Sequence, residues 1–322
     1  MAAPSPGVAT LSPAGRPAAR SGRLHGVKRS QLSRYLFCYA MLAPVLALFA
    51  YLRIIPIVQT FIMSLYKWDL TQPIHPFIGA DNYTALVSDE RFFQALRNTT
   101  LFSFATVIGS VALALPIAVL LAGQVRFTSL YQAIFFLPVI TPMVPMSVAW
   151  KWIYDPTRGI LNYLLGLVAI SPVGWLVYPE LALWAIIAMS IWKVVGYNMV
   201  ILLVGIKNIP VTYYEAGRID GADGFALFRY LTLPLLRPIL LVVFVTSTIN
   251  AYNVFTQVYV MTLGSQAAPG NALRVLVYEI YQNGFQFFRM GYASAEAVVL
   301  TVIVFALTLF QFWLMRRQQA LT

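Results

Sequence analysis

The sequence predicts an all-α, polytopic membrane protein with six transmembrane helices. Of the 322 residues, 60% are hydrophobic and only 10% are charged, whereas charged residues make up about a quarter of an average soluble domain. The apolar residues also form long unbroken runs rather than the ten-residue alternation of a membrane barrel. Because only helices and closed barrels satisfy their backbone hydrogen bonds in lipid, these runs predict membrane-spanning helices.

Six runs are long enough to cross a bilayer, which takes about 20 apolar residues. They cover residues 35–65, 99–122, 130–153, 181–206, 238–261 and 293–315. The first run is longer than a bilayer requires and contains Arg53 and Pro56, so we expect it to end or kink near these residues. Together with their connections, the runs form one six-span domain over residues 34–318.

Residues 1–33 differ from the rest of the chain in composition. They are rich in Ala, Pro, Ser, Gly and Arg, contain no acid, and show no hydrophobic period. This composition predicts a disordered tail. A signal peptide is disfavoured because no small-residue cleavage site follows the next apolar run, and an organellar transit peptide is a minor alternative.

The net charge of +11 is distributed as membrane topology predicts rather than as a nucleic-acid-binding surface. With six spans, thirteen Lys and Arg fall on the side of both termini and of the loop at residues 207–237, and six fall on the other side. The positive-inside rule therefore places both termini and this loop in the cytoplasm. One cysteine and two histidines exclude an intrachain disulfide and argue against a metal site.

The loop at residues 207–237 has the composition of a small folded element. Pro210 is suited to the start of a short helix over residues 211–219, Gly221 breaks that helix, and Asp223 is placed to cap a second one. We expect Pro234 to end this second helix and the fifth span to begin near Pro238. Small side chains at residues 216, 217, 221, 222 and 224 favour close approach by another protein over an amphipathic helix lying in the lipid headgroups.

Three short sequences in this loop carry a family resemblance: Glu215-Ala216-Gly217, Asp220-Gly221-Ala222 and Leu233-Pro234. Together they resemble the EAA loop of permease subunits of binding-protein-dependent ABC importers. Gly217 departs from the family pattern, which usually has Ala at the third position, and Gly lowers helix stability by about 1 kcal/mol relative to Ala. Further stretches at residues 77–103, 136–152, 154–166 and 276–295 resemble sugar permeases of the maltose and glycerol-phosphate type, so the resemblance covers about residues 35–315.

The resemblance implies a type I ABC importer permease fold with a set of partners. These are a second permease subunit, a cytoplasmic ATPase dimer that binds the ATP, an extracytoplasmic solute-binding protein, and membrane lipid. It also implies that Glu215 pairs with a basic residue of the ATPase and that the 213–234 loop couples the two subunits. Alternatively, Glu215 is a solvated loop acid or favours a helix N-terminus. The chain has no glycine-rich phosphate loop, so we expect no ATPase site and no cofactor of its own.

Polar residues in the fourth and fifth spans predict a substrate path. Asn250, Asn253 and Gln257 recur at steps of three and four, which places them on one face of a helix. Such amides suit an uncharged polar ligand, although interhelical hydrogen bonding is an alternative reason for them. The resemblance assigns Asn250, Asn253 and Tyr197 to positions that contact sugar. Lys193 in the fourth span either faces the path, where it would favour a phosphorylated solute, or extends outward to the membrane surface.

Two other functional classes remain open from the sequence. A secondary transporter or channel would act without an ATPase partner, but it usually needs intramembrane carboxylates or broken helices, and Glu296 is the one acid within a span. A non-transporting membrane scaffold would use the loop only for docking, and the amide face would then serve packing alone.

Overall fold

The structure, a computed structural model, describes residues 24–123, 126–262 and 270–319. The predicted tail therefore lies largely outside the described residues, although helix α1 already begins at Leu24, within the range predicted as tail. The chain divides into two compact units, Met1–Val58 and Gln59–Thr322, and each is described by itself. In the described part of the chain the regular secondary structure is helical, apart from one isolated bridge between Tyr66 and Phe77.

The first predicted span consists of three consecutive helical segments. Helix α1 covers Leu24–Phe49, a π-helical turn η1 covers Ala50–Ile54, and α2 covers Ile55–Met63. The π turn contains Arg53 and directly precedes Pro56, which confirms the expected irregularity at this place. A proline cannot donate to the preceding turn, and a π turn is one of the recurring ways in which helices absorb such a break.

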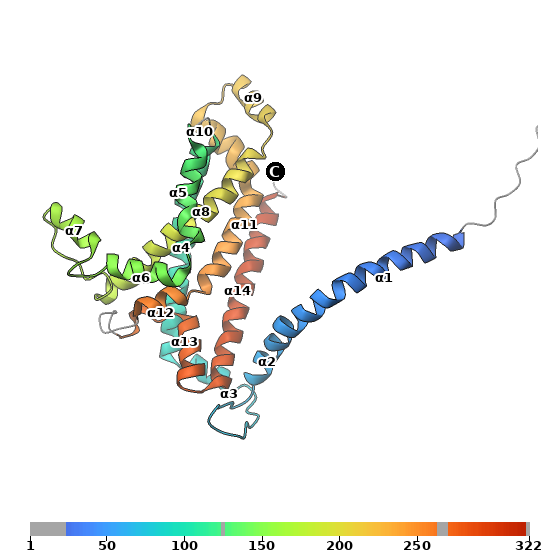
Figure 1. Cartoon of the computed structure of the whole chain (residues 1–322), viewed down its shortest axis with the longest axis vertical. Helices are drawn as coiled ribbons and strands as arrows, with labels where there is room; N and C mark the ends of the chain where they lie inside the picture. The colour runs from blue at the N-terminus through green and yellow to red at the C-terminus, as the bar shows by residue number, and fades with distance from the viewer. Residues whose placement is uncertain (1–23, 124–125, 263–269, 320–322) are drawn as a thin grey trace, which may run out of the picture. The chain divides into compact units, whose positions relative to one another are not determined.

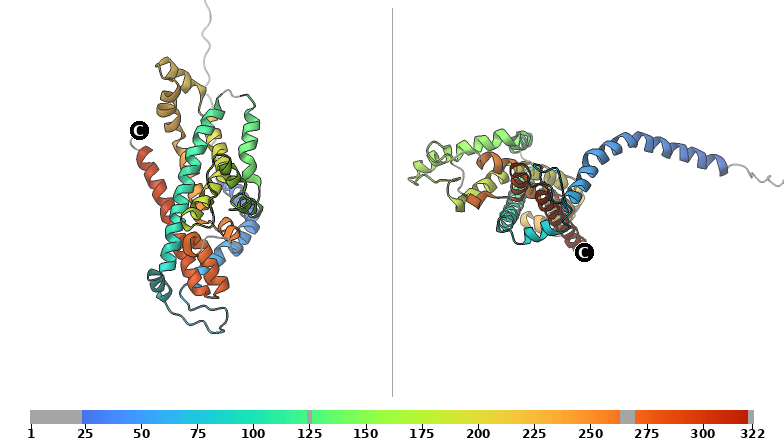
Figure 2. Two further views of the ribbon diagram at one scale, coloured as in Figure 1. Left: turned by 90° about the vertical axis from the view of Figure 1, so that its left-hand side faces the viewer. Right: turned by 90° about the horizontal axis from the view of Figure 1, so that it is seen from below.

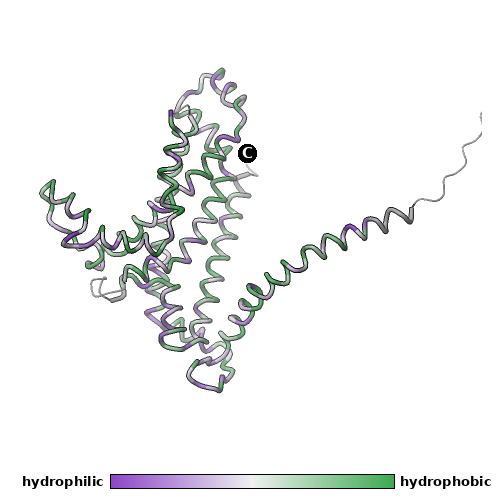
Figure 3. Tube along the Cα trace, viewed as in Figure 1, coloured by the Kyte–Doolittle hydropathy of each residue, from purple (hydrophilic) through white to green (hydrophobic). Residues whose placement is uncertain are grey.

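Four long helices form the centre of the second unit (Figures 1 and 2). They are α4 (Glu90–Ala122), α8 (Pro179–Lys207), α11 (Leu233–Tyr252) and α14 (Met290–Gln319). Helix α4 packs along α8 and against α11, and α14 packs against α11. Small residues such as Ala114 and Ala118, both fully buried, let α4 approach its neighbours closely. The long helices are hydrophobic over most of their length, whereas polar residues gather at the helix ends and loops (Figure 3).

The third predicted span is broken, and the prediction of one continuous helix was wrong. Helix α5 (Thr128–Ile140) and helix α6 (Met143–Ile153) meet at a bend of 98°. Pro142 follows the break and biases Thr141 toward an extended backbone, which Thr141 adopts with ψ 131°. The described residues accordingly contain five apolar helices long enough to cross a membrane, or six if the bent pair counts as one.

Short helices complete the two ends of this unit. At one end lie α9 (Val211–Ile219), α10 (Gly224–Leu227) and the π turn η2 (Phe228–Thr232). Toward the other end lie α3 (Asp81–Val87), α7 (Ile160–Leu167), α12 (Thr256–Thr262), η3 (Gly270–Leu273), α13 (Leu276–Tyr281) and the π turn η4 (Gln282–Gln286).

The loop region follows the predicted plan except at its end. Helix α9 and the start of α10 after Asp223 match the prediction, although the Asp223 side chain makes no capping hydrogen bond. Pro234 does not end the second helix. It lies in the first turn of α11, and the chain stays helical from Gly224 to Tyr252. The π turn just before Pro234 explains this continuity. In its wider hydrogen-bonded ring the Leu233 N–H donates to the Phe228 carbonyl, and this arrangement tolerates the absence of an N–H at Pro234.

Candidate functional site: a polar cavity between the long helices

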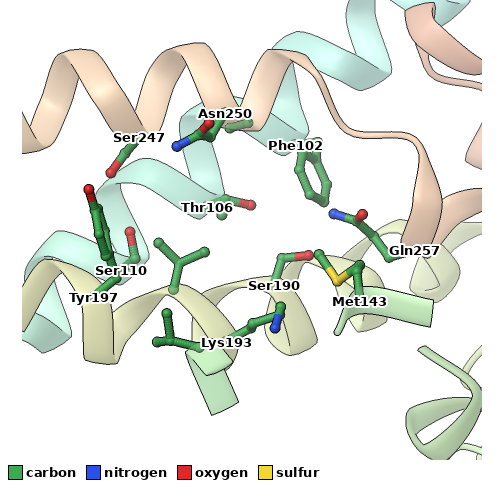
Figure 4. Close-up of a pocket in the computed structure, with 13 residues that line it drawn as sticks. Phe102, Thr106, Ser110, Met143, Ser190, Lys193, Tyr197, Ser247, Asn250 and Gln257 are labelled. Atoms are coloured by element: carbon green, nitrogen blue, oxygen red, sulfur yellow. The ribbon is translucent and has the colours of Figure 1, made fainter. Parts of the chain in front are cut away.

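A cavity of about 260 Å³ lies between α4, α8 and α11, near the break between α5 and α6. Helices α4, α8 and α11 each contribute polar side chains at helical spacing, so that one face of each of these three helices is polar where the cavity lies (Figure 4). The lining residues are Phe102, Thr106, Ser110, Val139, Met143, Ser190, Lys193, Val194, Tyr197, Ser247, Asn250, Ala251 and Gln257. No acid occurs among these described lining residues.

One wall of the cavity is fixed by a buried hydrogen-bond network. Asn198 is fully buried and joins three helices: its Nδ2 donates to Ser110 Oγ at 3.1 Å, and its Oδ1 accepts from Ser247 Oγ at 3.2 Å. The network satisfies polar groups that would otherwise cost free energy in an apolar interior. Asn198 therefore has a structural role: it holds three helices together by interhelical hydrogen bonds.

Two further hydroxyls on the lining have no such partner. Thr106 is 4% exposed and Ser190 is 3% exposed, and neither hydroxyl oxygen has a hydrogen-bond partner within the described residues. A buried polar group is nearly always hydrogen-bonded to protein or to ordered water. These two hydroxyls consequently provide hydrogen-bonding capacity that water or a polar ligand in the cavity can use.

Lys193 contacts both the cavity and the helix break. Its Nζ donates to the carbonyl oxygens of Pro138 and Thr141, each at 2.7 Å. These carbonyls lie at the end of α5, where helical carbonyls lack intrahelical partners and the helix dipole favours a positive charge. Of the two predicted orientations of Lys193, the one facing the cavity is the one observed, and its ammonium also caps α5.

The cavity brings together some of the predicted substrate residues and separates one of them. Tyr197, Asn250, Gln257 and Lys193 line it, whereas Asn253 does not. The predicted continuous helical face is wrong here: α11 ends at Tyr252, and the Asn253 amide donates back to the Ile249 carbonyl at 2.7 Å. Gln257 still reaches the cavity because α12 begins after this break.

The loop residues predicted to contact an ATPase lie at the end of the unit that carries α9 and α10 (Figure 1). Glu215, Ala216, Asp220 and Gly221 are exposed, and Gly217 is partly covered. Leu233 and Pro234 are partly buried in the first turn of α11 and belong to the helix rather than to the exposed loop.

Helix α9 is shaped by its glycines. After Ile219 the chain forms a Schellman turn, in which the Ala222 N–H donates to the Gly217 carbonyl at 2.9 Å and the Gly221 N–H donates to the Arg218 carbonyl at 3.1 Å. Gly221 has φ +81°, a left-handed conformation that favours glycine. An added Cβ at Gly217 would meet only the end of the Leu227 side chain, at 2.8 Å, so α9 packs closely on α10 there.

Four hydroxyl residues of the cavity were missed by the sequence analysis: Thr106, Ser110, Ser190 and Ser247. A spacing signal for them exists, because Thr106 and Ser110 are four residues apart, and Ser190 lies three and seven residues before Lys193 and Tyr197. Serine and threonine are common in membrane helices, however, since they also bond to their own backbone. Their spacing alone therefore does not distinguish a cavity wall from ordinary packing.

Comparison with known proteins agrees with this architecture. Residues 92–320 match the family model described as "Binding-protein-dependent transport system inner membrane component". The chain is 34% identical to the probable ABC transporter permease protein YurN of Bacillus subtilis, over 88% of this chain and 96% of that protein. It is 32% identical to the trehalose/maltose transport system permease protein MalF of Thermococcus litoralis, over 84% and 90% of the two chains.

A solved structure shares the fold. The crystal structure of a bacterial ABC transporter involved in the import of the acidic polysaccharide alginate superposes with a TM-score of 0.75 at 24% identity, covering 89% of this chain and 98% of that one. The apolar helices and the family of the present chain show that it is a multi-pass protein of a bacterial or archaeal inner membrane. The chain belongs to the inner-membrane components of binding-protein-dependent transport systems and is a permease subunit of an ABC importer.

Proposed function

We propose that this permease subunit forms half of the translocation pathway for a sugar or a related polar solute, and that the cavity is part of this pathway. The observation that carries the proposal is the convergence of an aromatic ring, two amides and unpartnered buried hydroxyls on one cavity without an acid. Amides and hydroxyls match the alternating donors and acceptors of a polyhydroxylated solute. Relatives named for trehalose/maltose and lactose transport support the same solute class.

The proposed importer contains further subunits. A second permease subunit would complete the pathway, an extracytoplasmic binding protein would deliver the solute, and a cytoplasmic ATPase dimer would bind and hydrolyse ATP. This chain would have no ATPase site or cofactor of its own. Both termini and the loop carrying α9 and α10 would face the cytoplasm, in keeping with the excess of Lys and Arg on that side.

In this proposal the loop transmits movement of the ATPase to the spans. Glu215 is exposed on α9. From α10 through η2 into α11 the chain is one uninterrupted helix, and α11 lines the cavity. A rigid connection of this kind carries a displacement at the loop to the cavity wall. Coupling requires such an element to have two arrangements, each favoured by one of the ligands.

The cavity is tested by a matched pair of amide variants in the assembled importer, with uptake of a panel of labelled sugars as the measurement. Asn250→Leu removes an amide that lines the cavity, and Asn253→Leu removes the same group three residues away, outside it. We expect Asn250→Leu to reduce uptake at least tenfold, about 1.4 kcal/mol, because a polar solute loses a hydrogen bond to the cavity wall. Equal uptake by both variants, with normal assembly, would contradict the cavity assignment.

The loop is tested by Glu215→Ala, with Asp223→Ala as the control because it removes an equal charge from the same loop. We expect Glu215→Ala to abolish uptake and the ATP hydrolysis stimulated by the binding protein, while Asp223→Ala retains both. If Glu215→Ala leaves both activities intact, a transporter acting without an ATPase becomes the better hypothesis.

A further inference from the structure

A second cavity, of about 790 Å³, lies under the loop at the end of two spans. Its walls come from the last turns of α4 and α8 and from α9, α10 and η2. Because α4 and α8 end here at Ala122 and Lys207, the cavity lies at the ends of two helices long and apolar enough to cross a membrane. It is separate from the solute cavity and shares no lining residue with it.

The charges of this second cavity are of one sign. Lys207 and Arg218 line it, and no Asp or Glu occurs among its described lining residues. Neither cation forms a salt bridge or a side-chain hydrogen bond with another described residue; the salt bridge found in the described chain, Arg274 to Glu279, is elsewhere. Two cations that line one cavity, with no acid among its described lining residues, attract an anion.

The remaining walls are mostly apolar. Val119, Ile206, Leu227 and Phe228 face the cavity, and its polar groups include the Tyr214 and Thr232 hydroxyls, which hydrogen-bond to each other at 3.1 Å. A small soluble anion would leave these apolar walls in water. An anion that carries an alkyl chain would cover them and place its charge on the two cations.

We propose that this cavity binds the phosphate headgroup of an anionic phospholipid, with Lys207 and Arg218 as the phosphate ligands and the apolar walls holding the start of an acyl chain. Basic pockets between membrane helices are a recognised form of lipid-binding site. The cavity volume lies within the range of ordinary ligand pockets, about 300–1,000 Å³, and accommodates a headgroup with its glycerol. The lipid would then contact α9 and α8 together, and would stabilise one position of the loop relative to the spans.

The test uses the assembled importer in nanodiscs and measures association of spin-labelled phosphatidylglycerol relative to spin-labelled phosphatidylcholine. The test variant combines Lys207→Gln with Arg218→Gln. The control combines Arg229→Gln with Arg237→Gln, which removes the same charge from the same region but from residues that do not line the cavity. We expect the test variant to lose roughly 30-fold in preference for the anionic lipid, because each of the two cations contributes a factor of about five. The control should lose much less.

Other outcomes would overturn the proposal. Equal losses in both double variants would mean that general surface charge attracts the lipid, and no loss in either would mean that the cavity holds none. Displacement of the labelled lipid by inorganic phosphate at physiological ionic strength would assign the cavity to a soluble anion. The variant combining Lys207→Arg with Arg218→Lys keeps both charges and should keep the preference. If this variant also loses the preference, the loss comes from misfolding at these positions and not from the missing charge. Because no solute is measured, failure here leaves the proposed transport function untouched.

Discussion

Lys193 shows how one residue makes an irregular membrane span stable. The break between α5 and α6 exposes carbonyl groups that a continuous helix would satisfy, and an unsatisfied backbone group in lipid costs several kcal/mol. The Lys193 ammonium satisfies two of these groups, because it donates to the Pro138 and Thr141 carbonyls, each at 2.7 Å. A cation in a span thus has a structural partner here without any acid.

We predict that Lys193→Met destabilises the protein by about 2–3 kcal/mol. The substitution keeps the length of the side chain but removes two charge-assisted hydrogen bonds, each worth about 1.5–3 kcal/mol, partly offset by the lower cost of burying methionine. The unfolding free energy in detergent, measured by chemical denaturation, checks this. Lys193→Arg retains donors and should lose less, and a methionine variant as stable as the wild type would show that the carbonyls have other partners.

At the scale of elements, the loop combines one required glycine with one that is replaceable. Gly221 completes the Schellman turn after α9 with φ +81°, whereas Gly217 is helical and meets only the end of a flexible leucine. The family usually has Ala at the position of Gly217, and the structure gives no steric reason against alanine there. The expected softening of α9 by Gly217 is therefore a property of helix propensity alone.

We predict opposite effects for the two alanine substitutions. Gly221→Ala forces an L-residue into the left-handed region and should destabilise α9 by about 1–2 kcal/mol. Gly217→Ala should stabilise α9 by up to about 1 kcal/mol, because Leu227 only needs to shift its terminal methyl group. Hydrogen exchange of the amides at residues 211–222, measured by mass spectrometry, distinguishes the two, and equal exchange in both variants would show that α9 is not held by its C-terminal turn.

On the scale of the whole molecule, a buried acidic cluster joins α13 and η4 to α14. Glu279 is 2% exposed and pairs with Arg274 at 2.9 Å. Asn283 donates to Glu279 at 3.4 Å and to both carboxyl oxygens of the fully buried Glu296, at 3.0 and 3.1 Å. Burial raises the pKa of Glu279 above its ordinary value of 4.5, and the Arg274 guanidinium opposes this rise.

This raised pKa predicts how stability changes with pH. The folded state holds the Glu279 proton more tightly than the unfolded chain, so this contribution is fully present below about pH 4.5 and is lost as the pH rises through the folded pKa. In the Glu279→Gln variant, the unfolding temperature should therefore decrease less than in the wild type as the pH is raised above 4.5. Glu180→Gln, which removes an exposed acid in the first turn of α8, is the control for the loss of a carboxylate as such. A Glu279→Gln profile that keeps the wild-type slope would contradict the assignment.

Much of this molecule was predictable because lipid restricts what a chain can do. Five spans and α9 follow from apolar run length and from Pro and Gly positions, which are local properties. The break at Thr141 and the end of α11 at Tyr252 were not predicted. Pro142 marks the first place in the sequence, but the Lys193 bonds that satisfy the freed carbonyls come from a distant residue, and apolar run length does not reveal where α11 ends. Helical spacing predicted one face for Asn250, Asn253 and Gln257; in the structure Asn250 and Gln257 line the cavity and Asn253 does not, because the helix ends between them.

The break between α5 and α6 also has a consequence for how the protein is made. Its carbonyls are satisfied by a lysine 52 and 55 residues further along the chain, which leaves the ribosome only after α5 and α6 have been synthesised. Until Lys193 has been synthesised, the Pro138 and Thr141 carbonyls lack this donor, and an unsatisfied backbone group in hydrocarbon costs several kcal/mol. We therefore expect a nascent chain that stops before Lys193 to hold its third span in the membrane less stably than a chain that includes Lys193.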